Sequence, residues 1–451
     1  MPLASKVELD LLLMRMLILR YLIVTCLLLI GSMSSAQLLS YQLSEAQQEK
    51  LTNMWQRSIN AANADAYLIV DDYLQRLTNR LAQAYDPPQP APTVRLIADD
   101  RFNAFAALGN FMGINAGLIK SVETEAQLAA IIAHELGHLY AQHNEQQITR
   151  QASVRNQSLA TFVAGMIIST VNAEAGAAIA VSGQAIAMNK LLAYSRANER
   201  EADAIAHEIL ANAGYPSNSL NLAFLHMSEI GRLNGEPPEW LSTHPSTDSR
   251  LAASLRERSD DNVEPSGAGP LRFVQQILAE PERFPDEAFA QAFHQPASEQ
   301  RFIALSSAAK PIEEDEARIT QLAMLSSACE ARLQVCPSLA ELWLQLRPND
   351  PVMQFALLDY YVATEAWRKG FDMLNKAKQQ LEHQPKFWRH YSAIMSNLGR
   401  QDDAVFGYAQ QLNWQGDLIG AIDYLERQAK RLNRPIYQQW AEELIQANEF
   451  D

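Results

Sequence analysis

The residues most able to do chemistry are two histidines and a glutamate in one short segment, His134-Glu135-Leu-Gly-His138. Positions four apart in a helix lie one turn apart on the same face, so both imidazoles can reach one metal ion. Histidines at this spacing bind zinc, and a glutamate beside the first can hold a water molecule as a general base. The spacing therefore predicts zinc-dependent hydrolysis; a pair of exposed helix histidines is the alternative.

A catalytic zinc needs a third protein ligand and one position left open for water. His143 is close in sequence, but a three-histidine pattern would need Gly at position 141 and His at position 144. Ala141 and Asn144 stand there instead. We therefore predict that His143 lies on the surface and does not bind the metal.

The better candidate for the third ligand is an acidic segment further along, Ser195-Arg-Ala-Asn-Glu199-Arg-Glu201-Ala-Asp203. A pair of acids on a helix is usually a solvated face. Here an aspartate follows the pair, and it could accept the free N–H of a ligand histidine, as carboxylates around metal sites do. These residue types alone leave open whether Glu199 or Glu201 would bind the metal.

Helices are predicted around this motif. Thr124-Glu-Ala-Gln127 resembles a capping box, and it predicts a helix that runs through Leu139 and carries both histidines. Apolar residues at three-to-four spacing predict helix over residues 42–85, ended by the proline-rich segment 86–92.

A small sheet is predicted between these helices. Thr93 to Ile97 is typical of a strand. The segments 103–108 and 111–115 flank Gly109-Asn110, a pair that favours the two-residue turn of a β-hairpin.

Composition excludes several classes of protein. With 451 residues, of which 48% are hydrophobic, the chain can form two or three units with real cores. The net charge of −15 argues against nucleic acid as a partner. Three cysteines exclude a disulfide-rich scaffold.

Cys329 and Cys336 are predicted to form a disulfide, because Pro337 begins a new helical pattern and a turn could join them; two free buried thiols are the alternative.

The first 36 residues are predicted to be a cleaved signal peptide. Arg15 and Arg20 precede the apolar run 21–31, and Ser34-Ser35-Ala36 places small residues before the cleavage point. The run is too short to cross a bilayer, which takes about 20 residues. The mature chain is therefore predicted to work outside the cytoplasm without a transmembrane segment. A start at Met14 or Met16, and lipidation of Cys26, are alternatives.

The rest of the chain is predicted to be helical. Residues 158–192, rich in Ala, Gly and Ile, favour a helical hairpin that is either buried or touches membrane or unfolded substrate. A polar linker precedes Pro270. Beyond it, Pro351 and Pro385 each open a helical pattern and lie 34 residues apart, the tetratricopeptide period. Such repeats form solenoids with a concave face for partners.

The motifs together resemble a known family. His134-Glu-Leu-Gly-His138 followed by Ser195-Arg-x-x-Glu199-x-Glu-Ala-Asp203 resembles the signature of the HtpX and CAAX-prenyl-protease family of zinc peptidases, and Asn103-Ala-Phe-Ala resembles its strand segment. Thr243-His244-Pro245, Ser249-Arg250-Leu-Ala252 and the helical half are similar to the periplasmic BepA-type protease–chaperones. The resemblance covers nearly all of residues 40–451. Leu108-Gly109-Asn110-Phe111 departs from the usual Gly-Gly turn.

The resemblance implies a mainly α fold with a small β-sheet. An HExxH gluzincin-type zinc peptidase domain would be followed by an all-α tetratricopeptide-like solenoid. The predicted units are the signal peptide (1–36), the peptidase domain (37–260), a linker (261–270) and the repeat domain (271–451).

The resemblance also implies a role for each site residue. His134, His138 and Glu199 would bind one Zn²⁺ per chain, and Glu135 would be the general base. Asp203 would support a ligand from outside, and Arg250 would orient the loop that carries His244. His244 would be either a fourth ligand or a stabiliser of the transition state, with an ordinary loop histidine as the alternative.

The implied function is a periplasmic zinc metalloendopeptidase, also a chaperone, in assembly and quality control of outer-membrane proteins. Misassembled or unfolded outer-membrane proteins would be cleaved while extended against the 103–115 hairpin. The repeat domain would reach the outer-membrane assembly machinery. The alternative is mainly a chaperone or scaffold with a latent peptidase site, although the intact Glu135 and Glu199 favour an active enzyme.

Overall fold

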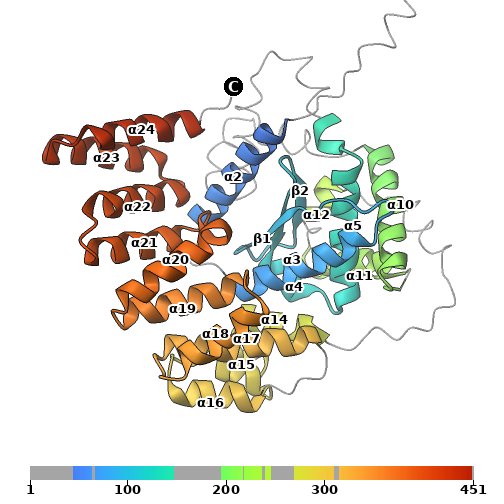
Figure 1. Ribbon diagram of the computed structural model, residues 1–451. Coiled ribbons are helices and arrows are strands. Elements are labelled where there is room, and N and C mark those ends of the chain that lie inside the picture. Colours follow the sequence, from blue (N-terminus) through green and yellow to red (C-terminus); the bar gives the residue numbers. More distant parts are fainter. Residues whose placement is uncertain are drawn as a thin grey trace, which may run out of the picture.

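The computed structural model describes residues 44–62, 67–146, 195–216, 218–235, 239–244, 269–308 and 314–448. The predicted signal peptide, the segment 158–192 and Arg250 lie outside these ranges. The described chain is mostly helical with one small sheet, as predicted (Figure 1). None of its helices is both long enough and apolar enough to span a bilayer.

Two helices open the described chain, α2 (Glu45–Ala62) and α3 (Leu68–Gln83). The prediction of one continuous helix over 42–85 is wrong, because Tyr67 is not helical and α3 begins after it. Helix α2 packs on the sheet through Leu51, Trp55 and Ile59 and also reaches the C-terminal helices, while α3 packs on β1. Asn60 near the end of α2 donates from Nδ2 to the carbonyl oxygen of His383, 3.0 Å away.

The sheet has the strand order β1-β3-β2, with β1 at Thr93–Ile97, β2 at Ala104–Ala107 and β3 at Phe111–Asn115. The predicted hairpin is confirmed: β2 and β3 are antiparallel, and Gly109 and Asn110 between them both have positive φ angles, 83° and 52°. The connection is one residue longer than the predicted two-residue turn, because Ala107 pairs with Phe111 and leaves Leu108, Gly109 and Asn110 between the strands. Strand β1 pairs with β3 in parallel, so β2 forms one edge of the sheet.

Helix α5 (Glu125–Tyr140) follows the short helix α4 (Ala116–Ser121) and lies at the centre of the N-terminal half. Its predicted capping box is confirmed. The Gln127 backbone N–H donates to Thr124 Oγ1 at 3.2 Å, and the Gln127 side chain accepts from the Thr124 backbone N–H. Residues 126–138 of α5 are all buried, so this helix is enclosed on every side.

Three further helices complete this half, α10 (Arg196–Asn212), α11 (Ser219–Asn234) and α12 (Glu239–Thr243). Helices α10 and α5 lie side by side (Figure 1). They are so close at Gly137 that a Cβ atom there would lie 2.8 Å from the Cα of Ala202. Only glycine allows this approach.

The C-terminal half consists of helices that succeed one another along a curved stack, yellow to red in Figure 1. They are α14 (Gly269–Leu278), the 3₁₀ helix η1 (Pro281–Arg283), α15 (Ala288–Phe293), α16 (Glu299–Ala308), α17 (Glu314–Glu330), α18 (Cys336–Leu346), α19 (Pro351–Ala363), α20 (Trp367–Leu381), α21 (Pro385–Asn397), α22 (Gln401–Trp414), α23 (Leu418–Leu432) and α24 (Pro435–Asn448).

Pro351 and Pro385 are the first residues of α19 and α21, as their 34-residue spacing predicts. Proline is well tolerated there because the first helical N–H has no partner within the helix. The predicted disulfide between Cys329 and Cys336 is confirmed. Helix α17 ends at Glu330 and α18 begins at Cys336, and the turn between them brings the two Cα atoms to 5.0 Å.

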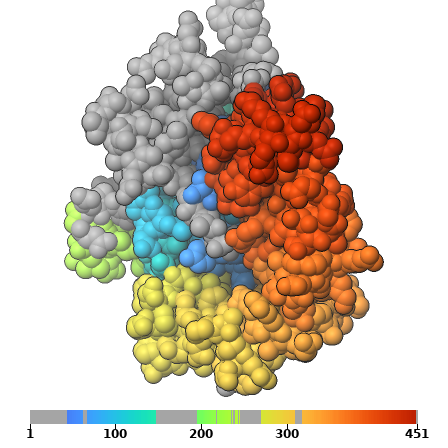
Figure 2. Space-filling view, turned by 90° about the vertical axis from the view of Figure 1, so that its left-hand side faces the viewer, coloured from blue at the N-terminus to red at the C-terminus, as the bar shows by residue number. Residues whose placement is uncertain are grey.

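The hydrophobic core does not stop at the predicted linker. Leu271, Val274 and Phe289 of the C-terminal half belong to the same buried cluster as α3 and α5. The two halves also share an ion-pair network, in which Arg318 of α17 contacts Asp72 of α3 and Asp350 at the start of α19, both at 2.7 Å. Figure 2 shows the C-terminal helices, yellow to red, as a continuous body along the N-terminal half.

Candidate metal centre and active site

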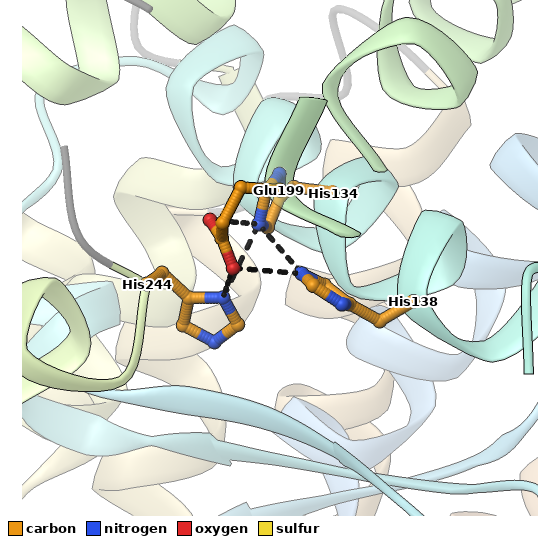
Figure 3. Close-up of side chains that lie close together, drawn as sticks. All are labelled: His134, His138, Glu199 and His244. Atoms are coloured by element: carbon orange, nitrogen blue, oxygen red, sulfur yellow. Dashed lines mark hydrogen bonds and ion pairs between the residues drawn. The ribbon is translucent and has the colours of Figure 1, made fainter. Parts of the chain in front are cut away.

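Helix α5 presents two histidines to one point, because His134 and His138 are one helical turn apart. Their Nε2 atoms lie 3.0 Å from each other, and both side chains are fully buried. Figure 3 shows the two rings directed to the same place.

Helix α10 brings a carboxylate to the same point. Glu199 is fully buried, with Oε1 3.5 Å from His138 Nε2 and Oε2 3.6 Å from His134 Nε2. The close packing of α10 on Gly137 makes this reach possible. Glu201 does not enter the cluster, and its side chain is 62% exposed. The geometry therefore favours Glu199 over Glu201 as the metal-binding acid.

His244, the residue after α12, completes the cluster in Figure 3. Its Nδ1 atom lies 3.3 Å from His134 Nε2 and 3.2 Å from Glu199 Oε1. The four ligand atoms, from His134, His138, Glu199 and His244, all lie within 4.8 Å of one another. Ligand atoms around a tetrahedral zinc with bonds of about 2.0–2.2 Å lie about 3.3–3.6 Å apart. Two or three imidazoles with one carboxylate are also a donor set that zinc accepts, so the cluster fits this ion.

Asp203 lies on the outer side of one of the cluster's histidines. Its Oδ1 is 3.0 Å from His134 Nδ1, the ring nitrogen that faces away from the cluster. A carboxylate there fixes the tautomer and the ring orientation of the ligand histidine.

The prediction that His143 is a surface residue is wrong, since the side chain is buried. Its Nδ1 lies 3.0 Å from His138 Nδ1, and its Nε2 lies 3.3 Å from Glu201 Oε2. Burial lowers the pKa of His143, although Glu201 opposes this effect. A neutral His143 can accept the Nδ1–H of His138 and donate to Glu201. His138 thus has an outer support, as His134 has in Asp203.

Glu135 faces the sheet and α12. Its Oε2 accepts from the backbone N–H of Ala106 in β2 at 3.0 Å, and its Oε1 accepts from Trp240 Nε1–H at 2.8 Å. His244 Nε2 lies 3.4 Å from the same Oε1. The carboxylate is therefore held beside the cluster.

Trp240 is a site residue that sequence reasoning missed. It is fully buried, donates to Glu135 and stacks on the ring of His244 with the centroids 4.6 Å apart. The signal was its spacing, since Trp240 and His244 are four residues apart, and the His244 backbone N–H donates to the Trp240 carbonyl oxygen at 2.9 Å as in a helical turn.

Helix α12 is attached to the loop between β1 and β2. Arg101 contacts Glu239 at 2.6 Å, and the Trp240 backbone N–H donates to the Phe102 carbonyl oxygen at 3.4 Å. Burial raises the pKa of Glu239, which Arg101 partly offsets. These contacts fix the place of His244.

The remaining histidines of the described chain do not join the cluster. His226 Nε2 contacts the carbonyl oxygen of Ser121 at 2.7 Å, and His390 contacts Asp359 in the C-terminal half. Arg250 lies outside the described residues, so its predicted effect on the His244 loop stays a prediction.

Residues 69–259 match the model of peptidase family M48. The four residues of the cluster all lie within this segment, and the match supports the prediction of a metallopeptidase. It agrees with the family that the sequence motifs resemble.

Curated relatives of the M48 domain carry two kinds of name. The chain is 22% identical over 410 residues to the "Beta-barrel assembly-enhancing protease" of Yersinia pestis, an alignment that covers 83% of each chain. It is 26% identical over 184 residues to the protein of that name from Escherichia coli K12, covering 41% of this chain and 38% of the relative. It is 28% identical over 156 residues to "Mitochondrial metalloendopeptidase OMA1" of Arabidopsis thaliana, covering 34% and 29%. Except with the Yersinia protein, these alignments span less than half of the relative.

Proposed function

We propose that the chain is a zinc metalloendopeptidase in which His134, His138 and Glu199 hold one zinc ion and Glu135 is the general base. The observation that carries the proposal is the convergence of these three ligands from α5 and α10 beside a carboxylate that binds no ligand atom. Three protein ligands are typical of catalytic rather than structural zinc.

The residues would divide the chemistry of peptide hydrolysis between them. Zinc, when bound, supplies Lewis acidity that activates water and polarises a carbonyl group. Glu135 would take a proton from water on its carboxylate and return it to the leaving amine. Its hydrogen bonds from Ala106 and Trp240 would hold the carboxylate in place while it does so. Asp203 would keep His134 in the tautomer that binds through Nε2.

The proposed setting is the periplasm, reached through the signal peptide over residues 1–36. Relatives are named for enhancement of β-barrel assembly, and we propose the same work here, with misassembled or unfolded outer-membrane proteins as substrates. The peptidase domain (37–260) would cut them. The C-terminal helices (271–451), taken as a tetratricopeptide-like domain after the linker 261–270, would contact the assembly machinery and assist folding.

A substrate trap tests this proposal. Glu135→Gln, expressed in the cell of origin, should hold zinc and bind its substrates without cutting them. The bound proteins, identified by mass spectrometry, should be outer-membrane β-barrel proteins. Glu201→Gln is the matched control, since that glutamate is exposed, and it should trap nothing. Recovery of the same proteins with both variants would contradict the proposal.

A second function has a specific observation in its favour, namely a chaperone or scaffold whose peptidase site is latent. His244 Nδ1 lies among the ligand atoms, 3.3 Å from His134 Nε2. As a fourth ligand it would fill the position that the catalytic water needs. Purified protein that promotes β-barrel assembly equally well as parent and as Glu135→Gln would favour this second function.

A further inference from the structure

Within the described ranges no strand pairs with the outer edge of β2, and the hydrogen-bonding pattern shows which residues face that edge. The Asn115 backbone N–H donates to the Asn103 carbonyl oxygen at 3.0 Å, so Asn103 points toward β3. Because backbone groups alternate along a strand, Ala104 and Ala106 point to the opposite side, away from β3. An extended polypeptide that adds to this edge would pair with those groups.

The backbone groups of Ala106 are already occupied by side chains of the chain itself. Its N–H donates to Glu135 Oε2 at 3.0 Å, and its carbonyl oxygen accepts from Asn144 Nδ2–H at 3.1 Å. The carboxylate is the proposed general base, so its place here belongs to the site. The amide of Asn144 reaches Ala106 from the helical turn over residues 143–146, which follows α5.

We infer that Asn144 is a specificity-determining residue, which competes with the backbone of a substrate strand for the carbonyl oxygen of Ala106. A side-chain amide N–H is the same kind of donor as a peptide N–H, and it stands where an added strand would place one. The inference rests on the proposed function, because it concerns the same site. It names the substrate class as extended segments without a strand partner.

The competition selects among polypeptides. A segment that is already paired in a folded sheet would have to lose its own hydrogen bonds as well as displace Asn144. An unpaired segment has only water to lose, so it replaces the side chain at little cost. Ala106 also contacts Glu135, so a strand that pairs there lies beside the general base. Asn144 thus discourages folded proteins from the place where cleavage would occur.

The test is binding of fluorescein-labelled β-casein, an unfolded protein, to the full zinc-loaded chain by fluorescence anisotropy, with Glu135→Gln present in every protein so that nothing is cut. Asn144→Ala should lower the Kd about two- to ten-fold, the range that one neutral hydrogen bond spans. Gln146→Ala is the matched control. The Gln146 amide lies in the same helical turn but donates to the Ala141 carbonyl oxygen instead of to Ala106. Its loss should therefore leave the Kd at the parent value.

Asn144→Asp keeps the size of the side chain, but the ionised carboxylate cannot donate a hydrogen bond, so this variant should also lower the Kd. It replaces Asn144→Ala in the test if that variant does not fold. In hydrolysis with zinc present and Glu135 restored, both variants should lower KM and leave kcat unchanged, which a purely structural defect would not do. The inference is overturned if the Kd is unchanged or if none of the proteins binds casein detectably. It is also overturned if the variants bind casein more weakly, because the substrate itself would then use the Asn144 amide. A tighter Kd in a chain that never hydrolyses casein would sustain it and count only against the proposed function.

Discussion

His134 and His244 meet edge to face at the candidate metal centre, with Nε2 of His134 3.3 Å from Nδ1 of His244. The two residues are 110 positions apart, and α12 places the second by its contacts with Arg101, Phe102 and Glu135. A histidine in this position can act as the fourth ligand of a tetrahedral zinc, in competition with water. Its neighbouring Nε2, 3.4 Å from Glu135, also suits a group that would stabilise charge during the reaction.

Replacement of His244 separates these two roles. If His244 is a fourth ligand, His244→Ala opens the site and raises hydrolysis of casein, which is the outcome we expect from the position of Nδ1. If it stabilises the transition state, the same change lowers kcat by about 10²–10³. His226→Ala is the control, because that ring contacts Ser121 away from the cluster. Unchanged activity of His244→Ala would reject both roles.

The zinc content of two variants tests whether Glu199 or Glu201 is the metal ligand. Glu199→Gln should lose most of its zinc, because it replaces a buried ligand, whereas Glu201→Gln should keep about one zinc per chain. Chelation of the parent should lower its Tm, since a metal that binds only the folded chain stabilises it. Zinc measured by atomic absorption after dialysis gives the answer. The reverse order of the two variants would show that Glu199 is not the ligand.

His143 should act on the metal through His138. With its Nδ1 3.0 Å from that of His138, His143→Leu removes the acceptor that orients the ligand and should weaken zinc affinity about 10- to 100-fold. His143→Gln, which can still accept a hydrogen bond, should recover part of the affinity. The measurement is competition with a zinc indicator dye. Equal affinity in the Leu variant and the parent would return His143 to a packing role.

The disulfide between Cys329 and Cys336 should stabilise the C-terminal helices. For so short a loop, the entropy that the bond removes from the unfolded chain is worth about 2–3 kcal/mol. The double change Cys329→Ala/Cys336→Ala should therefore lower the urea midpoint, and a reducing agent should lower that of the parent alone. A mass shift on alkylation of the unfolded, non-reduced mature protein would contradict the bond itself.

Sequence alone was sufficient for the parts of the site that belong to one element. The capping box gave the start of α5, and the four-residue spacing of His134 and His138 gave their common face. The Gly109-Asn110 pair predicted the hairpin that carries Ala106. Each of these depends on neighbours within a few positions, and such signals are readable along a chain.

The parts that failed depend on contacts between distant segments. His143 is five positions after His138, which is not a same-face spacing, and only the turn through Gln142, with its positive φ of 54°, carries it back to the helix. Its other partner, Glu201, is 58 positions away. The core that joins α14 and α15 to α5 is likewise invisible to local periodicity, which records that a face is apolar but not what covers it.

The most direct test of the account is hydrolysis by Glu135→Gln combined with His244→Ala, compared with His244→Ala alone. His244 is replaced by alanine in both proteins, so that a fourth ligand cannot block the site and mask the effect of Glu135. Both should contain about one zinc per chain, because Glu135 touches Ala106 and Trp240 rather than the ligand atoms of the other residues. The account predicts that casein hydrolysis is lost only in the protein that lacks the Glu135 carboxylate. Equal rates in two proteins with equal zinc would show that Glu135 is not the general base.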